Sequence, residues 1–245
     1  MKLTLAYIKT TALSLLRVPA YWVPTLLLPA MLFSFFGLPA AKQGPQVAAL
    51  VMASFSAFAV IGVSFYQFGI GIAQERVNPW DSYMRTLPTG PAPRIISQLI
   101  VALFFGIAAA GTVAAVTING ATLELSAGRW SVFAISLLLG SIPFTLMGIS
   151  IGYLAPPKAA VPIANLLHLP LTFAGGLWMR PVDLPQIVQV ISPYVPTRHL
   201  GEVVWAAVLG RDTPWQSWGW LLGYALFFAL IAAWARKRDE GERFR

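Results

Sequence analysis

The chain has no cysteine, only two histidines and few charged side chains. Without cysteine there are no disulfides and no thiolate metal sites. A catalytic metal site within the membrane would need a cluster of histidines and carboxylates, and the second histidine, His199, is predicted to lie outside the membrane. Charged residues make up 11% of the 245 residues and hydrophobic residues 57%, with a mean hydropathy of +0.70. A soluble domain of this size could not keep so much apolar sequence away from water.

Long apolar stretches dominate the chain. Six of them, none with Asp, Glu, Lys or Arg, cover residues 21–38, 47–73, 95–118, 131–154, 159–178 and 215–235. Each is near the ~20 residues with which a helix crosses a bilayer. Because they are continuous and not alternating, they predict helices and not the strands of a barrel. The predicted fold class is an all-α polytopic membrane protein, one transmembrane domain over residues 1–245 with six transmembrane helices.

The segments between these spans complete the predicted organisation. Residues 1–18 are predicted to form an interfacial helix, residues 74–94 a cytoplasmic loop and residues 236–245 a cytoplasmic tail. Residues 180–214 are too apolar for a solvated loop, whereas Arg198 and His199 argue against a complete crossing. Proline at 193 and 196 interrupts this segment. It therefore predicts two short re-entrant or interfacial outer helices between spans five and six.

The distribution of basic residues sets the predicted orientation. Twelve Lys and Arg residues flank the spans on the side of the termini, and five, at positions 42, 129, 180, 198 and 211, lie on the other side. Cytoplasmic segments carry the excess of Lys and Arg. Both termini are therefore predicted in the cytoplasm, with the chain in the inner (cytoplasmic) membrane. The net charge of +8 is explained by this topology, so nucleic acid is not an expected partner.

The energy source of any transport has to lie outside this chain. Ion-driven transporters hold titratable groups at depth, but no predicted span has an acidic residue. Within the predicted spans, His168 is the only candidate for the titratable group that a proton relay would need. A phosphate-binding G-x-x-x-x-G-K-[ST] loop is also missing.

The loop at residues 74–94 has features of a docking element. Asn78 and Pro79 are typical of a helix start, and Trp80 and Tyr83 would then give a short helix an aromatic surface. Such a helix, with both signs of charge beside it, suits a groove on a partner protein. An ordinary positive-inside loop with a tryptophan among the lipid headgroups fits the same pattern.

Two stretches resemble the permease subunit of type-2 ATP-binding-cassette (ABC) exporters, and the resemblance covers essentially the whole chain. In QERVNPWDSYMRTLPTGPAPRIISQLI, the pairs Glu75-Arg76 and Leu87-Pro88 match the coupling loop of that family, with Asn78-Pro79 in place of a glycine turn. In FAGGLWMRPVDLPQIVQVISPYVPTRHLGEVVWAAV, the residues that match the stretch after span five are Phe173, Gly175, Gly176, Pro181, Leu184, Pro185, Ile191 and Pro193, with Ser192 in place of the common asparagine.

The resemblance implies a permease that works as a dimer, with a second copy or a related chain. It also implies a separate ABC ATPase subunit that binds ATP and Mg²⁺, so this chain needs no cofactor of its own and is not itself an enzyme. The ATPase-coupling residues that follow from it are Glu75, Arg76, Trp80, Asp81, Tyr83 and Arg85. Most members of this family export their cargo.

Polar and aromatic residues of two spans are candidates for the cargo pathway or the dimer seam. Asn165, His168 and Thr172 share one face of the fifth span. The second span contributes Ser54, Phe58, Ser64, Phe65 and Gln67. Polar clasps between helices, or plain core packing, would use the same residues. An aromatic, weakly polar wall suits a hydrophobic or amphipathic small molecule or a lipid-like cargo. Pro193, Pro196 and His199 are candidates for an outer gate, with a static plug as the alternative.

Two other functions remain open. A membrane-embedded enzyme would need a serine such as Ser141 or Ser150 beside His168, and the sequence does not place one there. A structural membrane component without transport would need no ATPase partner.

Overall fold

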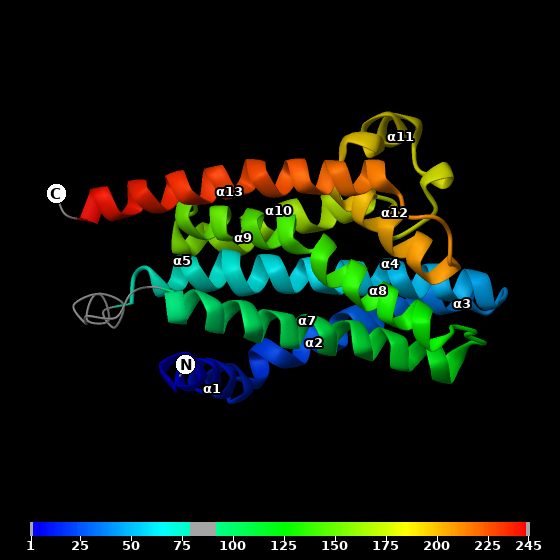
Figure 1. The fold of residues 1–245 in the computed structure, drawn as a ribbon, viewed down its shortest axis with the longest axis horizontal. Coiled ribbons are helices and arrows are strands. Elements are labelled where there is room, and N and C mark those ends of the chain that lie inside the picture. Colours follow the sequence, from blue (N-terminus) through cyan, green and yellow to red (C-terminus); the bar gives the residue numbers. More distant parts are fainter. Residues whose placement is uncertain (1, 79–91, 244–245) are drawn as a thin grey trace.

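The computed structural model describes residues 2–78 and 92–243. In these ranges every regular element is a helix (Figure 1). In chain order the elements are α1 (Lys2–Leu16), α2 (Pro19–Leu32), the π-helical turn η1 (Phe33–Gly37), α3 (Leu38–Ala41), α4 (Pro45–Ser64), the π-helical turn η2 (Phe65–Ile70), α5 (Gly71–Glu75), α7 (Ala92–Gly120), α8 (Ala127–Gly140), α9 (Ile142–Leu154), α10 (Pro157–Ala174), the 3-10 turn η3 (Pro181–Asp183), α11 (Gln186–Ile191), the 3-10 turn η4 (Ser192–Tyr194), α12 (Pro196–Leu209) and α13 (Trp215–Arg243).

The long helices run along the long axis of one elongated bundle (Figure 1). The two ends of the chain lie at the same end of this bundle, and α3, α11 and α12 lie toward the opposite end (Figure 1). The placement of both termini on one side of a membrane stays a prediction, and so does the side that is cytoplasmic.

Five helical stretches among the described residues are long and apolar enough to span a membrane. They are Pro19–Ala41, Pro45–Glu75, Ile96–Gly120, Ala127–Leu154 and Trp215–Asp239. The predicted span 159–178 corresponds to α10, whose 18 residues include Lys158, Asn165 and His168 and which is not among the five. Although α10 runs back toward the end that holds α11 and α12 (Figure 1), the sixth span stays a prediction.

Proline marks the start of many of these helices. α2, α4, α9, α10 and α12 each have proline at the first or second helical position. Proline is suited to this place because its missing N–H would have had no partner in the helix. The fourth predicted span is divided in this way: α8 ends at Gly140, Ser141 follows, and α9 begins at Ile142 with Pro143 as its second residue.

Helix α4 forms the centre of the bundle. From Met52 to Ser64 every residue is buried, and α4 packs against α2, α7 and α12. A helix that is apolar on all sides is expected to be enclosed by other helices. The core of the protein therefore lies around the second predicted span.

Helix α9 approaches the chain of the second span without side chains between the two backbones. A Cβ placed on Gly148 would lie 2.5 Å from the carbonyl oxygen of Ser64, and one on Gly152 would lie 2.7 Å from the carbonyl oxygen of Phe68. Glycine at these two positions thus permits the contact between α9 and η2.

The segments outside the spans are helical but differ in burial. α1 packs through Ile8 and Leu15 against a cluster formed mainly by α4 and α7. Helices α11 and α12 lie within residues 180–214. α12 is buried through Leu200, Val204 and other residues, so it is part of the bundle core, whereas α11 is exposed. The position of these helices in a membrane stays a prediction. The last helix continues through most of the predicted tail, to Arg243.

Candidate functional site

A cavity of about 500 Å³ lies between α2, the α4–η2 stretch and α10. Three of the predicted pathway residues line it, Phe58, Asn165 and His168. The first span adds Tyr21 and Thr25, which the sequence did not single out, and the remaining wall is mostly aliphatic. The residues that line the cavity are uncharged: they include no Asp, Glu, Lys or Arg.

His168 is the most enclosed polar group of this cavity wall. Its side chain is 2% exposed, and its ring stacks on Phe58 with 4.5 Å between the ring centroids. The Nε2 atom lies 3.1 Å from the carbonyl oxygen of Phe58, and because a carbonyl only accepts, Nε2 is the donor. Nδ1 is then an acceptor, and it has no hydrogen-bond partner among the described residues.

Two tyrosine hydroxyls of the cavity wall donate hydrogen bonds to side-chain amides. Tyr66 donates to Oδ1 of Asn165, which joins η2 to α10. Tyr21 donates to Oε1 of Gln67, which joins α2 to η2. These bonds fix the helices that enclose the cavity, so Gln67 acts as a clasp behind its wall.

Two prolines interrupt the backbone hydrogen bonds of α2 along the same wall. Pro24 and Pro29 lie inside α2 and have no N–H to donate to the carbonyls of Ala20 and Thr25, one helical turn earlier. Ala20, Pro24, Thr25 and Pro29 all line the cavity. The cavity is therefore an apolar site with a few acceptor groups.

The remaining predicted pathway residues lie inside the bundle. Ser54 accepts from Nε1 of Trp205 in α12 (2.8 Å), and the hydroxyl of Ser64 lies 3.3 Å from that of Thr145 in α9. Phe65 is fully buried. Thr172 accepts from Nε1 of Trp178 at 3.1 Å. Within one chain these residues join helices to each other, and a role at a dimer seam stays a prediction.

Two of the predicted coupling residues can be placed. Glu75 accepts from Nε2 of Gln98 in α7 at 2.9 Å, and Arg76 forms an ion pair with Asp239 of α13. The other four, Trp80, Asp81, Tyr83 and Arg85, lie outside the described residues. The sequence pointed to Arg76 but not to Asp239, which is 163 residues away along the chain.

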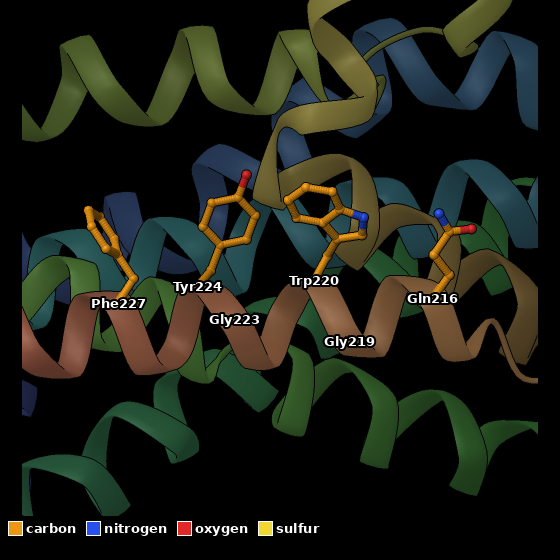
Figure 2. A pocket seen from close by; sticks show the side chains of 6 residues that line it. All are labelled: Gln216, Gly219, Trp220, Gly223, Tyr224 and Phe227. Carbon is orange, nitrogen blue, oxygen red and sulfur yellow. The ribbon is translucent and has the colours of Figure 1, made fainter.

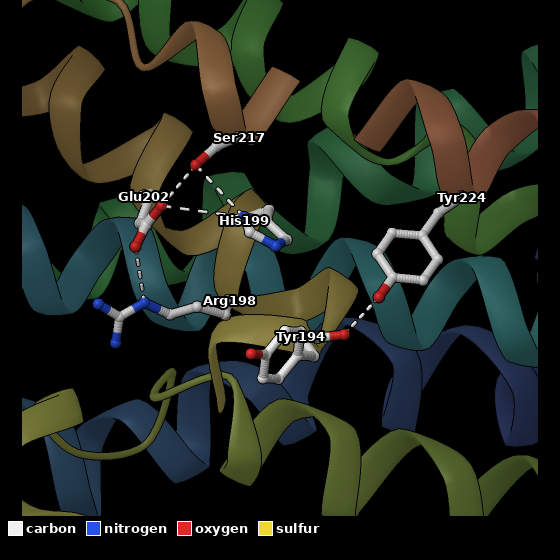
Figure 3. A network of polar contacts seen from close by, with 6 residues as sticks. All are labelled: Tyr194, Arg198, His199, Glu202, Ser217 and Tyr224. Atoms are coloured by element: carbon white, nitrogen blue, oxygen red, sulfur yellow. Dashed lines mark hydrogen bonds and ion pairs between the residues drawn. The ribbon is translucent and has the colours of Figure 1, made fainter. Parts of the chain in front are cut away.

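The predicted gate region contains a polar network between α12 and α13 (Figure 3). Arg198 donates to Glu202 (Nε–Oε1 2.9 Å), and Ser217 donates to the other oxygen of Glu202. Nδ1 of His199 lies 3.4 Å from the Ser217 hydroxyl. Pro196 opens α12, and Pro193 lies in the 3-10 turn η4 before it. The structure thus shows His199 as part of a contact between helices.

One face of α13 adjoins this network (Figure 2). Trp220 stacks on His199 with 5.3 Å between the ring centroids, and Tyr224 donates to the carbonyl oxygen of Tyr194. Gly219 and Gly223 leave an apolar groove of about 540 Å³ beside these rings. Trp220 and Tyr224 therefore join α13 to α12 and η4.

The pKa values of His199 and Glu202 are both shifted downward, for different reasons. Burial lowers the pKa of His199 below 6.5, and the charge of Arg198 adds to this, while Glu202 opposes it. Burial alone would raise the pKa of Glu202, but hydrogen bonds from Ser217 and Arg198 hold it below 4.5. At neutral pH the network therefore contains neutral His199 and ionised Glu202.

Acidification from about pH 7 to about pH 5 is expected to loosen the contact between α12 and α13. A group whose pKa is lower in the folded state stabilises the fold above its unfolded value, and this stabilisation is lost as the pH falls. For His199 the loss begins near 6.5, and Glu202 follows below 4.5. Hydrogen exchange of α12 amides, corrected for intrinsic rates, should increase. In His199→Gln the increase should be absent, and equal protection at both pH values in the parent would contradict the prediction.

The described contacts give little support to a membrane-embedded enzyme. Ser141 donates to the carbonyl of Leu138, and Ser150 donates to carbonyls of Leu146 and Phe228. The ring of His168 contacts Phe58, Phe65 and Tyr66, so neither serine is its partner. Among the described residues no three His, Asp or Glu side chains form a group that could hold a metal ion.

Comparison with known proteins agrees with the resemblance of the two motifs. The family model of the ABC-2 type transporter matches residues 2–209, which run from α1 to the end of α12. The chain is also 27% identical over 190 residues to the putative transport permease YvfS of Bacillus subtilis (strain 168), and the match covers 76% of each chain. With its several apolar helices, this multi-pass membrane protein belongs to the ABC-2 type transporter family.

Proposed function

We propose that the chain is the permease subunit of an ATP-driven exporter of neutral hydrophobic or amphipathic molecules, including lipid-like ones. A separate ABC ATPase subunit binds ATP and Mg²⁺ and docks on the segment 74–94. A second permease copy or a related chain completes the pathway in the inner membrane, with both termini in the cytoplasm. Membership of the ABC-2 family and the absence of a phosphate-binding loop in the sequence support this division of labour.

The uncharged cavity carries the cargo assignment. Its volume of about 500 Å³ lies in the range of small-molecule sites, which are mostly apolar with a few placed polar groups. A charged cargo would lose its hydration there without an ion to pair with. The polar groups of the wall, which include the hydroxyls of Tyr21 and Tyr66 and the amide of Asn165, favour a neutral cargo that can form hydrogen bonds.

Filling the cavity tests this assignment. Leu28→Trp should lower ATP-dependent transport of neutral amphipathic dyes such as Nile red by about tenfold, a loss of ~1.4 kcal/mol. Leu27→Trp is the matched control, because Leu27 is exposed to a similar extent (48% against 45%) but does not line the cavity. Both variants are reconstituted in vesicles with the ATPase subunit that co-purifies with the parent chain.

Three outcomes would contradict the proposal. If no ATPase subunit co-purifies with the active permease, a structural membrane component becomes the better interpretation. If the complex hydrolyses ATP but transports no neutral amphiphile, the cargo class is wrong. Equal transport by the two tryptophan variants would show that this cavity is not the cargo site.

A further inference from the structure

Three segments of the chain meet at the guanidinium group of Arg76, directly after α5. Nε donates to Oδ1 of Asp239 in α13 at 2.9 Å, and Nη2 contacts the same oxygen. Nη1 donates to the carbonyl oxygen of Gly152 at 3.0 Å and lies 3.5 Å from that of Ala155. One side chain thus joins the end of the second span to α9 and to α13.

The environment of this contact makes it stronger than an ordinary surface pair. Asp239 is 5% exposed and the Arg76 side chain 20% exposed, so solvent screens their attraction only in part. The two carbonyls belong to the C-terminal end of α9, where the helix dipole favours a cation. Hydrogen bonds to charged groups are stronger than neutral ones. The three segments therefore form one tightly held junction.

The neighbouring residue joins the same junction to α7. Glu75 accepts from Gln98, six residues after the start of α7 at Ala92. Glu75 thus connects the end of α5 to α7, the next described helix of the chain. Arg76 connects the end of α5 to α9 and α13. Glu75 and Arg76 point to different partners although they are consecutive.

We infer that Arg76 and Asp239 are positioning residues that make the end of α5, the end of α9 and the C-terminal part of α13 move as one body. This inference rests on the proposed function, because the body it describes would pass motion of an ATPase docked on residues 74–94 to the last helix. Without the pair, the docked segment would move while α13 stays behind. Neither residue lines the uncharged cavity.

Asp239→Asn tests the inference, since it removes the charge and keeps the size and one oxygen acceptor. The readout is permease-dependent ATP hydrolysis, which is hydrolysis by the complex minus hydrolysis by the ATPase subunit alone. It should fall about fivefold or more, the lower end of coupling between two sites, while the complex still co-purifies. The matched control is Asp183→Asn, whose ion pair with Arg180 is exposed (47% for Asp183) and should leave hydrolysis unchanged.

A distance measurement distinguishes a positioning role from a merely structural one. Cysteines are introduced at the exposed residues Val77 and Lys237 and carry the spin labels. Because the chain has no native cysteine, the distance measured is that between these two labels. Their distance should be the same in the nucleotide-free and ATP-trapped complexes of the parent and should differ between these states in Asp239→Asn. A parent distance that changes with nucleotide overturns the inference even if the variant does not assemble.

The remaining outcomes separate the two claims. If the parent complex shows no permease-dependent hydrolysis, the proposed function itself fails. If the parent shows it and Asp239→Asn retains both the hydrolysis and the constant distance, only the role of the Arg76–Asp239 pair is wrong.

Discussion

Gly148→Ala should destabilise the bundle by about 3 kcal/mol, a large effect for one added methyl group. The new Cβ would lie 2.5 Å from the carbonyl oxygen of Ser64 and 3.3 Å from Cβ of Phe68. The first of these is a backbone atom and has no rotamer with which to move away. Relief therefore requires α9 and η2 to separate, which would also weaken the packing of α9 on neighbouring helices.

The thermal unfolding midpoint in detergent micelles measures this effect. The matched control is Gly111→Ala in α7, where a Cβ would have no atom within 4 Å. Alanine is the better helix former by up to about 1 kcal/mol, so the control should be as stable as the parent or more stable. Similar midpoints for the two variants would mean that α9 and η2 are not in direct backbone contact.

The double variant Trp80→Ala, Tyr83→Ala is expected to reduce permease-dependent ATP hydrolysis by about 30-fold or more, as removal of an aromatic interface hot spot does. The two aromatic side chains would otherwise provide the apolar surface of the predicted docking helix. Both lie outside the described residues, so the expectation comes from the sequence. Folding, measured by the elution volume and the unfolding midpoint, should be unchanged.

The control for this prediction is Trp215→Ala at the start of α13. Trp215 is 77% exposed and lies at the end of the bundle away from Arg76. The residues at this end are predicted to lie on the outer side of the membrane. Its loss should leave hydrolysis at the level of the parent. A stable double variant with full hydrolysis would remove the docking role of the 74–94 segment.

The apolar stretches predicted the helices well because length and continuity are local properties of the sequence. Five of the six predicted stretches match helices long enough to span a membrane. Pro193 and Pro196 lie between the end of α11 and the first turn of α12, while the outer placement of these helices stays a prediction. The sequence did not predict how deeply α12 is buried. The burial of a short apolar helix depends on the helices that pack around it and not on its own composition.

The candidate site was predicted only in part, for a related reason. The spacing of Asn165, His168 and Thr172 placed them on one face, and two of the three line the cavity. Periodicity identifies a face but not the helix opposite it, so Tyr21 and Thr25 were missed. Asp239 was missed as well, because a carboxylate in a charged tail gives no local sign that it is buried against an arginine elsewhere in the chain.

The π-helical turn η2 fixes the direction in which the inner end of the second span faces. Such a turn takes one residue more than an α-helical turn. If the same residues formed a regular α-helix instead, everything beyond this turn would be rotated by about 100°. Glu75 and Arg76 would then turn away from Gln98 and Asp239. The π-helical turn thus gives Glu75 and Arg76 a direction that a regular α-helix of the same residues would not give them.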